Sequence, residues 1–180
     1  MTALLDLAKS SEEITLPRLW RALTPSEREA ALQSLTDDQE TRPQLIQFAM
    51  SLPRFRAFRP KAVARLTDAE LVSAVASSTQ LSPEFVRTAL VAMHLPGRAP
   101  MLGAFLEALG IPHEGGLITE GSTVAVPEGS DRMEGAIATL AKEFPRREVT
   151  IYLLSLVAMD PVTWKPLAAV LPGSVALLGE

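Results

Sequence analysis

Hydrophobic positions along this chain recur with the spacing of amphipathic helices. Leucine, alanine and valine stand three or four positions apart, which places them on one face of a helix with 3.6 residues per turn. Glycines and prolines interrupt the pattern at short intervals and mark helix ends. The spacing predicts about nine or ten helices. They are expected at residues 2–9, 16–23, 25–35, 43–51, 61–77 with a break, 83–94, 99–109, 131–144, 146–159 and 161–171.

Capping residues mark the start of four helices. Thr24, Thr67, Ser82 and Asp160 are each followed directly by a proline or an acidic residue. A side-chain oxygen at such a position accepts a hydrogen bond from the unpaired backbone N–H groups of the first turn, where proline loses no needed donor. Thr24 and Thr67 are followed three positions later by glutamate, which is the spacing of a capping box. These are the most firmly predicted helix boundaries.

The segment VTIYLLSLVAM, at residues 149–159, has no polar face. It is either a helix buried on all sides or a strand led by Val149, Thr150 and Ile151. Its length and the bracketing prolines 145 and 161 favour the helix. We therefore expect a central buried helix here.

Residues 110–130 lose the helical period and gain glycine. Leu117–Thr119 and Thr123–Val126 have the composition of two short strands and can pair as a hairpin across the three residues between them. The alternative is a mobile linker. Both interpretations separate the helices before residue 110 from those after residue 130.

The helices on the two sides of this connector follow a similar plan. A shift of 66 positions superposes Val91–Met93 on Val157–Met159 and Pro100 on Pro166. The match is either a coincidence, which we favour, or a duplicated three-helix unit of the kind found in helical repeat proteins.

These patterns predict an all-α fold. We expect a multi-helix bundle or a short helical-repeat array, with at most one small β-hairpin near residues 117–126. An N-terminal helical subdomain is expected over residues 1–60, followed by a six-helix part over residues 61–180 that contains the glycine-rich connector. The alternative is one continuous domain.

Composition narrows the class of protein. The chain contains no cysteine, which excludes disulfides and thiolate metal sites. Asp6, Glu12 and Glu13 stand where a signal peptide requires basic and then apolar residues, and no apolar run is long enough to cross a bilayer. We expect a soluble, cytoplasmic protein without membrane attachment. The net charge of −4 gives no overall attraction to nucleic acid.

Both histidines lie in one stretch of turns, from Met93 to Gly116. Helix ends account for most of that stretch. Gly110 has the position of a left-handed residue after a helix, and Gly103 inside the helix predicts the close approach of another backbone. His94, Arg98, His113 and Glu114 are left without a structural explanation.

These four residues are the candidate ligand site. Imidazole, guanidinium and carboxylate groups bind a small molecule or a metal, or share a proton. His94 and His113, however, stand at opposite ends of a helix about 16 Å long, so both reach one ion only if the flanking loops fold back. The spacing favours the alternative, in which His94 stabilises a helix C-terminus and His113 lies in a solvated turn. We expect no metal site and no cofactor.

A second candidate site is the basic segment from Thr41 to Thr67, which contains no acidic residue. Its cations alternate with Phe55 and Phe58, a pattern typical of surfaces that bind single-stranded nucleic acid. In the alternative that we favour, the two rings fix a short turn to the core while the cations are solvated or pair with Asp37, Asp38 and Glu40. The candidate nucleic-acid-binding residues are Arg54, Arg56, Arg59, Lys61 and Arg65.

The sequence favours a protein without catalytic residues. No nucleophile elbow, P-loop or dinucleotide-binding glycine pattern follows a predicted strand.

The C-terminal segment PLAAVLPGSVALLGE is apolar and must pack on its own domain or on a partner. We expect a helical protein–protein interaction or adaptor module that associates with a protein partner or with itself. The alternatives are small-molecule or metal binding at the first candidate site and nucleic-acid binding at the second.

Overall fold

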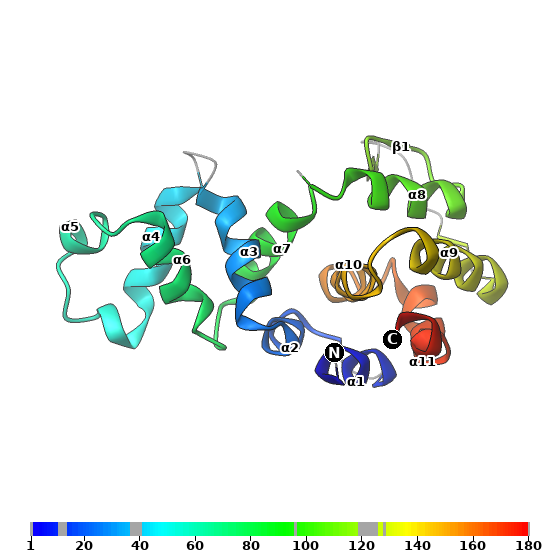
Figure 1. The fold of residues 1–180 in the computed structure, drawn as a ribbon, viewed down its shortest axis with the longest axis horizontal. Coiled ribbons are helices and arrows are strands. Elements are labelled where there is room, and N and C mark those ends of the chain that lie inside the picture. The colour runs from blue at the N-terminus through cyan, green and yellow to red at the C-terminus, as the bar shows by residue number, and fades with distance from the viewer. Residues whose placement is uncertain are drawn as a thin grey trace. The chain divides into compact units, whose positions relative to one another are not determined.

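The structure is a computed structural model that describes residues 2–10, 14–36, 41–95, 97–118, 126–127 and 129–179. Within these residues the chain forms eleven α-helices, one 3-10 helix (η1) and one two-stranded hairpin (Figure 1). The all-α prediction is confirmed. The elements are α1 (Thr2–Lys9), α2 (Leu16–Ala22), α3 (Pro25–Thr36), α4 (Arg42–Ser51), η1 (Pro53–Phe55), α5 (Pro60–Val63), α6 (Asp68–Ala76), α7 (Pro83–His94), α8 (Ala99–Leu109), β1 (His113–Glu114), β2 (Leu117–Ile118), α9 (Ser130–Glu143), α10 (Arg146–Met159) and α11 (Lys165–Leu178).

Three of the four predicted capping residues, Thr24, Thr67 and Ser82, hold helix starts. Asp160 accepts a hydrogen bond from the Thr163 N–H at 3.0 Å, but this bond closes a turn and the next helix begins at Lys165. Thr24 and Glu27 form a reciprocal pair, in which the Thr24 N–H donates to the carboxylate at 2.7 Å and the Glu27 N–H donates to the Thr24 hydroxyl at 3.3 Å. Thr67 and Glu70 form the same capping box at the start of α6. The Ser82 hydroxyl accepts from the N–H three residues later at 3.3 Å. Local side-chain chemistry therefore sets these boundaries, as the sequence predicts.

The helices group into two compact units that differ from the expected division of the chain. One unit, here called the terminal unit, consists of Met1–Ala22 and His94–Glu180. The other, the inserted unit, consists of Leu23–Met93. The boundary expected at residue 60 does not coincide with this partition, because α3, α4 and α6 pack on one another within the inserted unit while α1 and α2 pack on the C-terminal helices. In the described residues, no helix is both long and apolar enough to cross a membrane.

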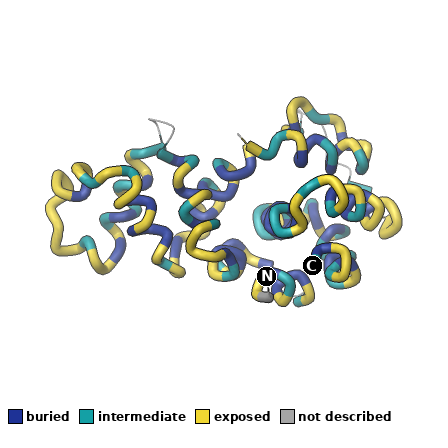
Figure 2. Tube along the Cα trace, in the orientation of Figure 1, coloured by how far each residue is buried: buried dark blue, intermediate teal, exposed yellow. Residues whose placement is uncertain are grey.

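The terminal unit is built around α10, the predicted central helix. Helices α1, α2, α9 and α11 all contact α10 (Figure 1). Residues Val149 to Ser155 of α10 are all buried, which explains why this segment has no polar face (Figure 2). The alternative of a strand is wrong at this position.

The apolar C-terminal segment packs on the terminal unit as part of α11. We expected a helix over residues 161–171, but it starts at Lys165 and runs past Pro172 to Leu178. A proline inside a helix removes one backbone hydrogen bond. Leu171 and Leu178 are both completely buried, and α11 packs on α1 and α9, so apolar burial offsets that cost.

The β-hairpin pairs different residues from those expected. Its register is His113 opposite Ile118 and Glu114 opposite Leu117. Leu117 and Ile118 form a strand as predicted, but their partner precedes them, because consecutive glycines at 115 and 116 provide the two positive φ angles of a tight turn. Residues 119–125, which include most of the second strand that we expected, lie outside the described part of the chain.

Glycine also shapes the contacts of α8. Gly110 adopts the left-handed conformation after α8, with φ of 69°, as predicted. A Cβ atom at Gly116 would lie 2.7 Å from the Leu102 Cβ and 3.2 Å from the Gly103 backbone nitrogen. The hairpin backbone at Gly116 therefore lies directly against α8. At Gly103 itself the close neighbour is a side chain and not the expected backbone, because a Cβ there would lie 3.3 Å from the Cε1 atom of the His113 imidazole.

The packing of the inserted unit centres on α4 and α6. Helices α3 and α4 pack on α6, and α4 also contacts η1 and α5. Phe48 of α4 stacks on Phe85 of α7, with ring centroids 4.1 Å apart and planes inclined by 15°. The stretch from Pro53 to Lys61 is mostly exposed to solvent, as Figure 2 shows. This stretch carries most of the basic residues predicted as a candidate site.

Candidate functional site

His94 and Arg98, two residues of the first candidate site, are neighbours in the terminal unit. The Nη1 atom of Arg98 lies 3.5 Å from the Nδ1 atom of His94. On its other side, the Nε2 atom of His94 lies 3.1 Å from the Ser155 hydroxyl. Arg98 in turn pairs with Glu148, whose carboxylate oxygen is 3.2 Å from Nε. A polar chain of four side chains thus runs from inside the unit to its surface.

The hydrogen bonds that His94 makes with Ser155 and Arg98 fit a neutral imidazole. The Ser155 hydroxyl donates to the Ile151 carbonyl oxygen at 2.7 Å, so it accepts from His94 Nε2–H. The Nδ1 lone pair then accepts from Arg98. Burial, reinforced by the Arg98 charge, lowers the pKa of His94 from 6.5 to about 3. A nucleophilic serine would need the opposite polarity, with its proton directed at the imidazole, and access to substrate. Ser155 is completely buried and out of reach of a substrate. The hydrogen bonds among these side chains therefore connect helices inside the terminal unit.

His113 and Glu114, the other two residues of the first candidate site, lie in the hairpin. His113 Nδ1 accepts from the Gly116 N–H at 3.3 Å, and Nε2 lies 3.7 Å from the Glu107 carboxylate. Glu114 is exposed. The two imidazoles therefore contact different partners. Among the described residues, no three histidine or acidic side chains come together in the way that a metal ion requires.

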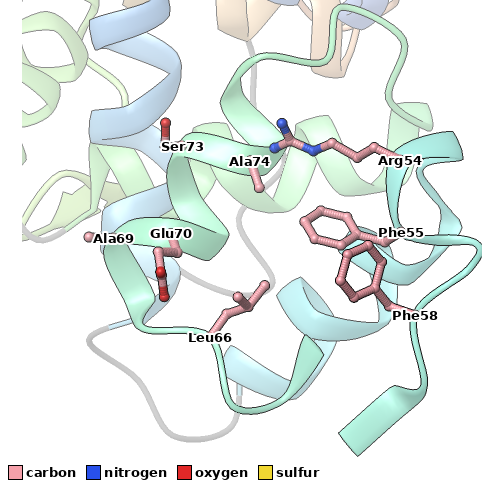
Figure 3. A pocket seen from close by; sticks show the side chains of 8 residues that line it. All are labelled: Arg54, Phe55, Phe58, Leu66, Ala69, Glu70, Ser73 and Ala74. Carbon is pink, nitrogen blue, oxygen red and sulfur yellow. The ribbon is translucent and has the colours of Figure 1, made fainter. Parts of the chain in front are cut away.

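The second candidate site contains an open groove beside α6. We call it the α6 groove. It has a volume of about 570 Å³ and brings the segment around η1 close to one side of α6 (Figure 3). The residues that line it are Arg54, Phe55, Phe58, Leu66, Ala69, Glu70, Ser73 and Ala74.

Two aromatic rings make one wall of the α6 groove. Phe55 and Phe58 meet edge to face, with ring centroids 5.7 Å apart and planes inclined by 65°. Both rings lie on the side opposite Glu70 in Figure 3, with Leu66 between. Phe58 is 55% exposed and Phe55 is partly exposed. The sequence-based expectation that both rings fix the turn to the core is therefore met only in part by Phe55 and not by Phe58.

The five predicted cations are all exposed, and Arg54 is the one among them that lines the α6 groove. Only one of them has a described interaction with a side chain: the Arg54 guanidinium lies 5.0 Å from the centre of the Phe55 ring. None of the five forms an ion pair with a carboxylate of the described residues. The acidic residues considered as their partners, at positions 37, 38 and 40, lie outside those residues. Arg54 thus brings one positive charge to the aromatic end of the α6 groove.

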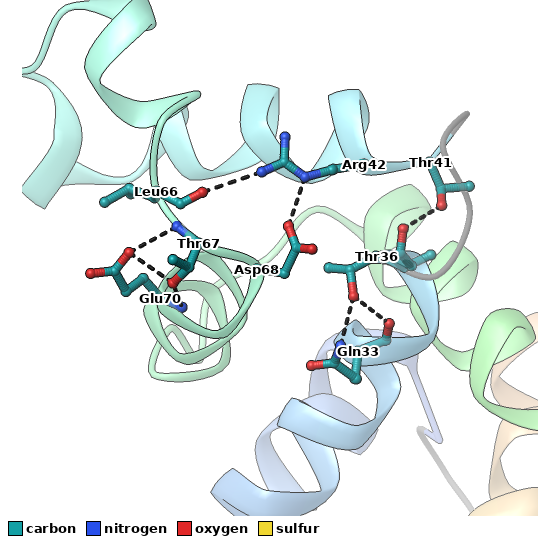
Figure 4. A network of polar contacts seen from close by, with 9 residues as sticks. Gln33, Thr36, Thr41, Arg42, Leu66, Thr67, Asp68 and Glu70 are labelled. Atoms are coloured by element: carbon teal, nitrogen blue, oxygen red, sulfur yellow. Dashed lines mark hydrogen bonds and ion pairs between the residues drawn. The ribbon is translucent and has the colours of Figure 1, made fainter.

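Arg42 holds the opposite wall in position. Its Nε atom pairs with the Asp68 carboxylate at 2.6 Å, and its Nη2 atom donates to the Leu66 carbonyl oxygen at 3.2 Å (Figure 4). These contacts join α4 to the turn that precedes α6. Because Leu66 lines the groove, Arg42 is a positioning residue for this wall.

Among the described residues, Glu70 is the carboxylate that lines the α6 groove. Its Oε2 atom accepts from both the N–H and the hydroxyl of Thr67, at 2.8 Å each (Figure 4). These hydrogen bonds lower the pKa of Glu70, so the side chain is ionised at neutral pH. The groove therefore has a basic end near Arg54 and an acidic group near the start of α6.

Comparison with known proteins identifies no relative. No protein-family model, no curated protein and no solved structure matches this chain. Its function has to be inferred from the geometry of its own residues.

Sequence reasoning found the residues at the basic end of the groove but missed its other half. Leu66, Ala69 and Ser73 carry no chemical signal in the sequence, and only the packing of α6 beside η1 gives them a role. Ser155 was also missed. Its signal was present, because it is one of few hydroxyl residues in an otherwise apolar helix, and a buried hydroxyl needs a partner.

Proposed function

We propose that the inserted unit is a non-catalytic protein-recognition module and that its α6 groove receives apolar side chains from a segment of a partner protein. The exposed Phe58 ring supports this proposal most directly. An aromatic side chain that faces water beside a second aromatic ring gains free energy when a partner covers it. In this proposal, the helical groove that the sequence leads us to expect in an adaptor is the α6 groove.

The composition of the groove supports the same function. Apolar side chains from η1, from the turn before α6 and from α6 itself converge on one open volume, and small residues at positions 69, 73 and 74 leave room for an incoming side chain. Grooves of this kind bind amphipathic segments through a few apolar anchors. The imidazole and hydroxyl groups of the buried polar chain, by contrast, serve packing inside the terminal unit.

Display of random peptides of about 16 residues on phage tests the proposal. The immobilised protein should enrich peptides that lose binding to the Phe58→Ser variant. Val162→Ser is the matched control, because Val162 is 85% exposed but belongs to the terminal unit and does not line the groove. Enrichment that does not depend on Phe58 would contradict the proposal.

Self-association is the version of this function in which the partner is a second copy. Sedimentation velocity over a range of protein concentrations separates the two cases. A dimer that dissociates in the Phe58→Ser variant would identify a second copy as the occupant. A monomer at all concentrations would leave a different protein as the partner.

A further inference from the structure

The α6 groove continues across α6 toward α3. A second hollow, of about 410 Å³, is lined by Gln33 and neighbouring residues of α3 and by Ala69 and Ser73 of α6. The same two residues of α6 also line the α6 groove. Ala69 and Ser73 are exposed, small and one helical turn apart, so they form a low ridge between the two hollows. One extended or helical segment can therefore lie over both.

Charge differs between the two ends of this combined surface. The aromatic end carries Arg54 and is flanked by the exposed Arg56 and Arg59, without described ion pairs. The hollow toward α3 carries the carboxylate of Glu29, and the carboxylate of Glu70 lies in the α6 groove itself, near the start of α6. A bound segment is thus attracted by its acidic residues at one end and repelled by them at the other.

We infer that the occupant is a protein segment with bulky apolar residues flanked by acidic side chains, whose acidic part lies over Phe55 and Phe58. This inference rests on the function proposed above. The apolar residues enter the α6 groove, the adjacent carboxylates face the arginines, and the uncharged continuation of the segment crosses the ridge of Ala69 and Ser73.

Two observations favour such a segment over a single-stranded nucleic acid. Bases bind by stacking on free aromatic faces. The Arg54 guanidinium already lies over the Phe55 ring, and the edge-to-face packing of Phe55 with Phe58 restricts the rings further. In addition, a phosphate backbone that followed the surface toward α3 would meet Glu29 and Glu70. Nucleic-acid binding is retained as an outcome of the test.

Fluorescence anisotropy with defined probes tests the inference. The probes are the most enriched peptide from the display selection, the same peptide with every Asp and Glu replaced by Asn and Gln, and an oligothymidylate of similar length. We expect the acidic peptide to bind about tenfold more tightly than its amide counterpart at low salt, and this difference to shrink as salt screens the charges. The double substitution Arg56→Gln and Arg59→Gln should remove the difference and leave binding of the amide peptide unchanged.

Lys142→Gln is the control for a general charge effect, because Lys142 is an exposed cation of α9 in the terminal unit. It should leave the preference for the acidic peptide intact. Equal binding of the acidic and amide peptides, with both lost in Phe58→Ser, would overturn the inference while the proposed function stands. Tighter binding of oligothymidylate than of either peptide, lost in the arginine double variant, would also overturn it. If the display selection yields no peptide whose binding depends on Phe58, both the proposed function and the inference are refuted.

Discussion

The Nε2 atom of His94 lies 3.1 Å from the Ser155 hydroxyl, across 61 positions of sequence. This hydrogen bond joins the end of α7 to the middle of α10, and both side chains are buried. Polar groups inside an apolar core stabilise the fold only while each is satisfied by a partner. The bond therefore makes the stability of the terminal unit sensitive to pH and to the loss of either side chain.

The first prediction concerns pH. The pKa of His94 is about 3 in the folded protein, below the ordinary value of 6.5 that applies after unfolding. As the pH falls from 6.5 toward 3, the unfolded state binds a proton that the folded state does not, so the free energy of unfolding falls by about 1.4 kcal/mol per pH unit. We expect a loss of about 2 kcal/mol from this residue by pH 5.

Urea unfolding at pH 7 and pH 5 measures this effect. The His94→Gln variant cannot take up the proton. Between pH 7 and pH 5 its free energy of unfolding should therefore fall by about 2 kcal/mol less than that of the wild type. His113→Gln keeps His94 and should keep the full pH dependence. An identical pH dependence in the wild type and in His94→Gln would show that His94 does not stay neutral in the fold.

The second prediction concerns Ser155. Its replacement by alanine leaves the His94 Nε2–H without a partner in the core, and we expect a loss of about 1–3 kcal/mol in the free energy of unfolding. Ser174→Ala is the matched control. Ser174 is also buried, but its hydroxyl donates to the Val170 carbonyl oxygen of its own helix, so its removal should cost much less. Chemical denaturation of both variants at pH 7 gives the comparison.

The third prediction concerns the two glycines of the hairpin turn. Both have positive φ, 57° at Gly115 and 85° at Gly116, so alanine at either position costs about 1–2 kcal/mol in backbone strain. At Gly116 the new Cβ would also lie 2.7 Å from the Leu102 Cβ and 2.9 Å from the Ala99 carbonyl oxygen, whereas at Gly115 nothing lies within 4 Å. Gly116→Ala should therefore lower the melting temperature clearly more than Gly115→Ala. Equal effects would mean that the hairpin does not lie against α8.

The fourth prediction separates surface from core aromatics in the inserted unit. Phe58→Ser should change the free energy of unfolding by no more than about 0.5 kcal/mol, because the ring is largely exposed. Phe85→Ala removes a ring that is only 8% exposed and stacked on Phe48, and should cost about 3–5 kcal/mol. Calorimetry on both variants checks this pair. A large loss of stability in Phe58→Ser would assign the ring to the core rather than to a binding surface.

The sequence by itself determined most helix boundaries. The starts at Pro25, Asp68 and Pro83 follow from the capping residues before them, and the end of α8 follows from Gly110. Each of these signals acts within about four residues, through hydrogen bonds between a side chain and its own backbone or through a single φ angle. Such interactions do not depend on what the helix packs against, so they can be read from the order of residues.

Only the tertiary structure decided which helices pack together and which side chains meet. Several apolar stripes of similar composition can pair in many ways, and the choice depends on shape complementarity between distant segments. That choice places Leu23–Met93 in a unit of its own, brings Ser155 to His94, and carries α11 through Pro172 because the burial of Leu178 outweighs a lost hydrogen bond. It also places α6 beside η1, which turns a basic, aromatic stretch of sequence into one wall of a groove.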